Sequence, residues 1–171
     1  MAAPLLIRNA PLALLLSLSA GCGHLFYIPE PGLRGTPEQI GVPYEDVHLT
    51  ARDGTRLHGW FLPARLEPGQ RHRGMIYFLH GNAENISTHF MVMSWITRQG
   101  WDLFLIDYRG YGMSGGTPHI HGAHLDAYAG LQWAVARARQ NGLPLVVLGQ
   151  SLGGATAATL VAHSQPGEVQ A

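Results

Sequence analysis

Short, wholly apolar segments alternate with longer amphipathic segments through most of the chain. The apolar segments are Met75 to Leu79, Leu103 to Ile106 and Leu145 to Leu148. Strands that are apolar on both faces are typical of a parallel sheet covered by helices on both sides. Helical spacing follows each of them, over residues 86–99, 122–141 and 155–162. The alternation predicts an α/β fold in a single domain, with a mostly parallel sheet.

The region before the first apolar segment has a different pattern. Val47 to Thr50 alternates between apolar and polar residues, Asp53-Gly54 is a strong turn signal, and Leu57 to Leu62 is extended again. These residues predict an N-terminal antiparallel hairpin. Residues 29–43 are rich in proline and glycine without periodicity, which indicates a linker or an extended arm lying on the domain.

Charge and composition exclude several functions. The 171-residue chain has eleven basic and eleven acidic residues, and all of the basic residues are arginines. A neutral chain offers no basic surface for a nucleic-acid backbone, so we expect no nucleic-acid partner. The absence of lysine excludes Schiff-base chemistry, a phosphate-binding P-loop lysine and a Ser–Lys dyad.

The N-terminus has the pattern of an export signal. Arg8 precedes the apolar run Ala10 to Leu18, and small residues lead to the sole cysteine, Cys22. This arrangement resembles the lipobox of bacterial lipoproteins, in which the cysteine is lipidated. The resemblance implies a signal peptide over 1–21, an anchor and linker arm over 22–43, and a membrane-anchored lipoprotein of the bacterial cell envelope. Secretion to the periplasm, an uncleaved anchor and a cytosolic protein with a buried apolar segment remain open.

The strongest chemical motif follows the last apolar strand. Gly149-Gln150-Ser151-Leu152-Gly153 is a G-x-S-x-G sequence placed between a strand and an alanine-rich helix. A sharp strand-to-helix turn exposes the serine hydroxyl, and the helix N-terminus offers free N–H groups to a developing oxyanion. A glycine-rich turn with a capping serine is the alternative interpretation.

Three further motifs occur in a fixed order before this one: DGTRLHGWFLPA, FLHGNAEN and IDYRGYGMSGG. Together with GQSLGG, the series resembles the α/β-hydrolase superfamily, and in particular its serine-hydrolase branch with HGN and DYRGYG motifs. The resemblance covers residues 44–165. It implies an α/β-hydrolase fold and a serine hydrolase of the carboxylesterase or acyl-hydrolase type that forms an acyl-enzyme without a cofactor.

Residue by residue, the resemblance makes Ser151 the nucleophile and places the oxyanion hole at the backbone N–H groups of Leu152 and of Asn82 or Ala83. It assigns His80 a structural role. We expect Asp107, Tyr108 and Arg109 to stabilise their loop, with Asp107 and Arg109 as a buried, satisfied pair. Gln150, next to the serine, and Glu84, in the HGN loop expected near the elbow, are candidates for substrate contact.

The order of the triad is where the resemblance ends. The superfamily places its acid and then its histidine after the serine. Here the candidates are Glu168 and His163, and His163 lies twelve residues along the same helix, about 18 Å from Ser151. We therefore expect residues 44–171 to be the N-terminal portion of the domain, with the C-terminal part of the fold missing and little activity in this chain alone.

Two other functions remain as alternatives. The first is a non-catalytic, lipid-anchored binding protein on a degenerate hydrolase core. The second is a metallohydrolase that uses the cluster His119, His121, His124 and Asp126, although we assign no metal site. The expected partners are the membrane, through the lipid anchor, and a small-molecule ester, thioester or amide, with carboxylic esters and lipid-derived acyl groups favoured.

Overall fold

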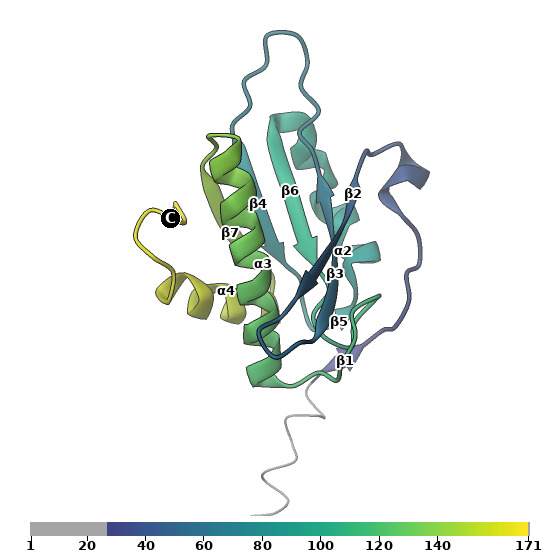
Figure 1. Ribbon diagram of the computed structural model, residues 1–171. Coiled ribbons are helices and arrows are strands. Elements are labelled where there is room, and N and C mark those ends of the chain that lie inside the picture. The colour runs from purple at the N-terminus through teal and green to yellow at the C-terminus, as the bar shows by residue number, and fades with distance from the viewer. Residues whose placement is uncertain (1–26, 171) are drawn as a thin grey trace, which may run out of the picture.

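The computed structural model describes residues 27–170, so the predicted signal peptide and Cys22 lie outside the described residues. Its core is a five-stranded sheet with the strand order β2-β3-β6-β4-β7 (Figure 1). The strands of this sheet are β2 (Glu45–Thr50), β3 (Arg56–Leu62), β4 (Gly74–Leu79), β6 (Trp101–Ile106) and β7 (Leu145–Gly149). The helices are η2 (Pro37–Ile40), α2 (Ile86–Met93), η3 (Ser94–Gln99), α3 (Ile120–Gln140) and α4 (Leu152–Ala162).

The sheet combines the two predicted arrangements. Strands β6, β4 and β7 are parallel, whereas β2 and β3 form an antiparallel hairpin that joins the sheet through β6. The hairpin turn is closed by a backbone hydrogen bond from Gly54 N–H to Ala51 O at 2.8 Å. The α/β class, the mostly parallel sheet and the N-terminal hairpin are therefore confirmed.

Helices cover both faces of the sheet, which explains why the parallel strands are apolar on both sides. On one face, small residues of α3 such as Ala127 and Ala134 pack with Tyr77 and Phe104, and α4 adds Leu160. On the other face, Ile86 and Phe90 of α2 pack against the residues that point the opposite way from the same strands. The alternation of side-chain direction along a strand thus divides one sheet between two cores.

All three predicted helices differ from the structure at their ends. The one expected over 155–162 begins at Leu152, because Gly153 and Gly154 belong to its first turn. The helix expected over 86–99 is an α-helix only to Met93 and continues as the 3-10 helix η3, where the Thr97 hydroxyl donates to Ser94 O at 2.8 Å. Such hydroxyl-to-backbone bonds compete with regular helical pairing. The helix expected from residue 122 begins at Ile120, because the His119 side chain accepts a hydrogen bond from Gly122 N–H and caps it.

The proline-rich arm lies on the domain. Strand β1 (Ile28–Pro29) pairs in parallel with β5 (Ala83–Glu84), which lies in the loop after β4. The Asn85 side chain donates to the backbone carbonyls of Glu30 and Gly32. The arm is therefore bonded to the segment that carries the HGN motif.

Strand β7 has one exposed edge among the described residues. It pairs with β4 on one side, and on the other its described contact is a backbone hydrogen bond from Gln170 N–H to Leu145 O. Leu148 is 40% exposed. A largely apolar strand with unpaired backbone groups favours pairing with another chain.

We therefore expect the 171-residue chain to self-associate at this edge. Replacing Leu148 by lysine places a charge there and should raise the monomer fraction measured by size-exclusion chromatography. Tyr128→Lys, at an exposed position on α3, is the matched control and should leave the fraction unchanged. A chain that is already monomeric at micromolar concentration would contradict this expectation.

Candidate active site

Ser151 is the residue at the turn between β7 and α4, and its backbone angles are φ 52° and ψ −115°. This conformation is rare for a residue with a side chain and costs on the order of 1–3 kcal/mol, which the surrounding structure must offset. The side chain is exposed at the carboxyl end of the sheet. The strand, the strained serine and the following helix reproduce the arrangement that the G-x-S-x-G motif predicts.

Two glycines allow this turn to form. A methyl group on Gly149 would overlap the backbone of Gly153, and one on Gly153 would overlap the carbonyl of Leu79 at the end of β4. A larger residue at either position would force the helix away from the sheet. The motif therefore brings the N-terminus of α4 against the neighbouring strand.

The loop after β4 lies directly beside the serine. Gln150 N–H donates to Leu79 O at 3.0 Å, and the Cα of Gly81 faces both Ser151 and the imidazole of His89. This loop carries Asn82 and Ala83. Leu152 begins α4, where N–H groups have no partner within the helix. The structure thus brings together the elements that hold Ser151, Leu152, Asn82 and Ala83.

Side chains hold three successive carbonyl groups of this loop. His80 Nδ1 donates to Gly81 O at 2.7 Å, Tyr111 Oη donates to Asn82 O at 2.6 Å, and His89 Nε2 donates to Ala83 O at 3.0 Å. In a trans peptide the C=O group and the next N–H group point in opposite directions. His80 therefore fixes the direction of Asn82 N–H, and Tyr111 fixes that of Ala83 N–H.

Tyr111 and His89 were not among the residues singled out in the sequence. Tyr111 is the second tyrosine of the DYRGYG motif, and burial raises its pKa to about 12, so its hydroxyl keeps the proton that it donates. His89 lies nine residues after His80, on α2, and the two imidazoles stack with ring centroids 5.1 Å apart. Only the folded contacts reveal either role, because both residues come from elements outside the loop.

The two substrate-contact candidates lie beside this loop and the elbow. Gln150 is exposed next to Ser151. Glu84 has a φ of 64° and lies 3.6 Å from the guanidinium of Arg34. Gln150 is therefore the freer of the two to meet a bound molecule.

His80 is completely buried, and burial lowers its pKa to about 4. Because its Nδ1 faces a carbonyl oxygen, that nitrogen carries the proton of the neutral ring. Asp107 lies on the other side, 3.9 Å from His80 Nε2, and accepts a hydrogen bond from Ile86 N–H at 2.9 Å. His80 is therefore enclosed between the Gly81 carbonyl and Asp107.

The expected pairing of Asp107 with Arg109 is wrong. The Arg109 guanidinium bonds Asp126 on α3 at 2.8 Å and Asp53 in the hairpin turn at 2.7 Å. Asp107 lies instead between His80 and His58. Both residues lie beyond Ile106, the last residue of β6, and Arg109 begins a turn, so the regular alternation of a strand does not bring the two side chains together. Arg109 thereby ties the hairpin turn to α3.

The histidine cluster proposed for a metal is used differently. His119 caps α3 through Nδ1 and lies 3.2 Å from the Arg109 guanidinium through Nε2, while Asp126 is bonded to Arg109. Neither side chain has a free group to offer a metal ion. Within residues 27–170, no three His, Cys, Asp or Glu side chains are arranged to hold one.

The residues after the nucleophile do not return to it. His163 ends α4, where its Nδ1 bonds Thr159 O at 2.7 Å. Glu168 lies 3.8 Å from Arg139, near the end of α3. Among the described residues that follow Ser151, His163 and Glu168 are the histidine and the carboxylate that could act as its base and acid. Both lie away from the elbow.

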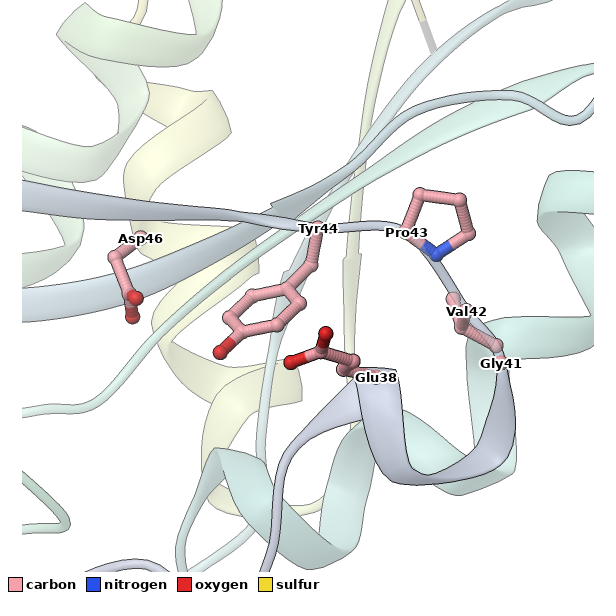
Figure 2. Close-up of a pocket in the computed structure, with 6 residues that line it drawn as sticks. All are labelled: Glu38, Gly41, Val42, Pro43, Tyr44 and Asp46. Carbon is pink, nitrogen blue, oxygen red and sulfur yellow. The ribbon is translucent and has the colours of Figure 1, made fainter.

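A cavity of about 480 Å³ lies at the opposite edge of the sheet, beside β2 (Figure 2). Tyr44 and Glu38 both line it. The Asp46 carboxylate, also in its wall, accepts hydrogen bonds from His58 and Trp60. Four strand spacings, about 19 Å, separate β2 from β7, so this cavity is not part of the serine site.

The fold and the strained serine elbow define the class of the protein as an α/β hydrolase. The sequence profile of the family described as serine aminopeptidase, S33, matches residues 70–171. The chain belongs to this family.

Relatives and solved structures agree with this assignment. The chain is 36% identical to YfhR of Escherichia coli K12 over 91% of its length and 56% of that protein. It is 37% identical to the α/β hydrolase domain-containing protein WAV2 of Arabidopsis thaliana, over 86% of this chain and 48% of that one. The Pyrococcus furiosus esterase Pf2001 superposes with a TM-score of 0.68 and 24% identity, over 84% and 54% of the two chains, which shows the fold alone.

The chain spans about half the length of the curated relatives it matches. No helix among residues 27–170 is long and apolar enough to cross a membrane.

The buried histidines give the stability of the protein a defined pH dependence. The unfolded chain binds a proton at His80 below its ordinary pKa of 6.5, whereas the folded chain does so only near 4. The free energy of unfolding should therefore fall by about 3 kcal/mol as the pH decreases from 6.5 to 4. His58 acts in the opposite sense, because Asp107 and Asp46 outweigh its burial and raise its pKa, so its contribution is lost as the pH rises through that value.

His80→Asn tests the first effect, because the asparagine amide still donates at the Nδ1 position but does not titrate. Urea unfolding between pH 4 and 6.5 should lose most of its pH slope in this variant, whatever its absolute stability. The exposed His121→Asn serves as the control and should keep the slope of the parent. An unchanged slope in His80→Asn would assign the acid sensitivity to another group.

Proposed function

We propose that this protein is a serine hydrolase that forms an acyl-enzyme on Ser151. The observation that carries the proposal is the strained, exposed serine between β7 and α4, beside a loop whose carbonyl groups are individually held. Backbone strain at an exposed serine has no evident structural benefit, and such strain concentrates at functional sites. The proposed oxyanion hole consists of the N–H groups of Leu152 and of Asn82 or Ala83.

The proposed reaction follows from this arrangement. The Ser151 hydroxyl attacks the carbonyl carbon of an ester, thioester or amide, and the N–H groups stabilise the negative charge on the oxygen. The bond to the alcohol, thiol or amine then breaks, the leaving group takes the proton that the serine has lost, and the acyl group stays on Ser151. Water later hydrolyses this acyl-enzyme to the free acid and restores the serine hydroxyl. The proton of the serine requires a base, since a free hydroxyl is a weak nucleophile. Because the acid and histidine of this superfamily follow the serine in chain order, we propose that residues beyond Ala171 supply them. Without them, turnover should be lower by about 10⁴-fold.

A non-catalytic binding protein on the same core remains the second candidate. The absence of a base near Ser151, among the described residues that follow it, favours this function. The held oxyanion loop favours catalysis instead, because a binding module gains nothing from N–H groups aimed at a transition state. Carboxylic esters and lipid-derived acyl groups are the substrates that we propose.

The cellular location that we propose is the bacterial envelope, with Cys22 lipidated after removal of residues 1–21. The motive is the apolar run that ends in Ala20-Gly21-Cys22. Metabolic labelling with a radioactive fatty acid should mark the parent chain and not Cys22→Ser. Equal labelling of both would leave secretion or an uncleaved anchor as the explanation of the leader.

Ser151 should react covalently with a fluorophosphonate in a version of the chain extended by its downstream residues. Mass spectrometry should locate the adduct on the peptide that contains Gly149 to Gly153, and Ser151→Ala should abolish it. Ser164→Ala, at the end of the same helical region, is the control and should label normally. An adduct on Ser114 or Ser87 would refute the assignment of the nucleophile.

The Tyr111 hydroxyl should increase the rate at which Ser151 reacts with the fluorophosphonate. Tyr111→Phe removes the bond to Asn82 O and frees the following peptide to rotate, so we expect the phosphonylation rate to fall by about tenfold, which is less than for complete loss of an oxyanion donor. The exposed Tyr128→Phe is the matched control. A folded Tyr111→Phe protein that labels at the parent rate would show that the Ala83 N–H is not a donor to the oxyanion.

A further inference from the structure

Four large apolar side chains are exposed together on the outer surface of α2, η3 and η2. They are Ile40, Met91, Val92 and Trp95, each between 54% and 64% exposed. Met91 and Val92 lie four and three residues before Trp95, the spacings that bring side chains together along a helix. We call this surface the α2 patch.

Two hollows show that the α2 patch is continuous. One, of about 240 Å³, is lined by Ile40 together with Phe90 and Met91. The other, of about 260 Å³, is lined by Ile40 together with Trp95. Because both hollows include Ile40, this side chain lies between Met91 and Trp95 and joins η2 to the helical surface.

Helix α2 is therefore apolar on two sides. Its inner side is buried, where the Phe90 ring packs on Trp60 at a centroid distance of 5.5 Å and Ile86 is fully covered. Its outer side carries Met91 and Val92. Apolar side chains that are exposed together on one surface are typical of a protein or membrane interaction site.

The charged side chains that line the two hollows of the α2 patch are positive, while Glu38 of η2 lines the separate cavity beside β2. The two hollows are lined by three arginines, Arg34, Arg65 and Arg98, and by no carboxylate. Arg34 is neutralised by Glu30 at 2.7 Å. Within residues 27–170, neither Arg65 nor Arg98 forms an ion pair, although the chain as a whole is neutral.

The backbone around these groups is held in place. Arg65 N–H donates to Thr97 O at 2.8 Å, and the Gln70 side chain donates to Arg98 O at 2.8 Å. The Trp95 indole N–H donates to Val92 O at 3.0 Å, which leaves the ring itself facing solvent. The backbone that carries Arg65 and Arg98 is therefore held beside the Trp95 ring.

We propose that the α2 patch docks on a membrane surface that contains anionic phospholipids. Tryptophan beside aliphatic side chains is typical of the membrane interface, where the apolar groups enter the acyl boundary. Arg65 and Arg98 bind the lipid phosphates, and each such charge strengthens attachment to an anionic leaflet. An anionic lipid surface fits better than a protein partner, since the hollow that holds Arg65 and Arg98 places two unneutralised arginines beside Ile40 and Trp95 and has no carboxylate in its lining. The inference does not depend on the proposed hydrolase activity.

A local probe tests this docking, because the N-terminal leader could by itself bind lipid. In the Cys22→Ser chain, Val92→Cys carries an environment-sensitive NBD fluorophore. On vesicles containing phosphatidylserine, its emission should shift to the blue and be quenched by doxyl-labelled lipid. The same label at Tyr128→Cys, on exposed α3, should do neither. Vesicles of phosphatidylcholine alone should give a much weaker response at position 92.

Charge variants then test the arginines. Removing both charges with Arg65→Gln and Arg98→Gln should weaken the vesicle affinity reported by the label at position 92 by about 25-fold, or about fivefold for each charge. The matched pair Arg52→Gln and Arg56→Gln, also exposed, removes the same net charge elsewhere and should change it by less than about twofold.

Three results would overturn the proposal. In the first, the protein does not bind the vesicles, or it binds them while the label at position 92 stays in water. In the second, both arginine pairs have the same effect. In the third, the label shifts with protein concentration in the absence of lipid, which would assign the α2 patch to a second copy of this chain.

Discussion

The close contact between the β7–α4 turn and the end of β4 is the constraint on which the site depends. Gly153 lies against the Leu79 carbonyl and Gly149 against the first turn of α4, so the helix N-terminus approaches the sheet as closely as backbone atoms allow. This approach forces Ser151 into a strained conformation and brings the loop at Gly81 beside it. The strained conformation is maintained because β4 and β7 are paired with each other and packed against the helices.

Buried polar groups then position the loop that faces the serine. His80 is held neutral by burial, and it directs one carbonyl, while Tyr111 directs the next from the loop after β6. That second loop is itself stabilised by Arg109, which bonds the hairpin turn and α3 at once. The hairpin, the arm and α3 therefore act on the site through a chain of hydrogen bonds, although none of them lies at Ser151.

The sequence predicted the elements of the fold well and their ends less well. The wholly apolar strands and the Asp53-Gly54 turn specify a parallel sheet with an attached hairpin, because burial on both faces excludes other arrangements. The helix after residue 86 changes to a 3-10 helix, since side-chain hydroxyl groups of Ser94 and Thr97 compete for backbone carbonyls. The helix after residue 119 starts early because a histidine caps it, a role that composition does not signal.

For the site, the sequence by itself determined the elbow. A G-x-S-x-G motif between an apolar strand and a helix requires small residues around an exposed serine, and neighbouring residues in the chain meet this requirement. The tertiary structure alone decided which side chains form hydrogen bonds and ion pairs around the elbow. Arg109 bonds Asp126 and Asp53 rather than Asp107. Tyr111 reaches the loop from the segment after β6, and His89 reaches it from α2, six residues after Ala83. A local pattern fixes which backbone conformations a segment adopts, whereas the direction and depth of each side chain follow from how the sheet and helices pack.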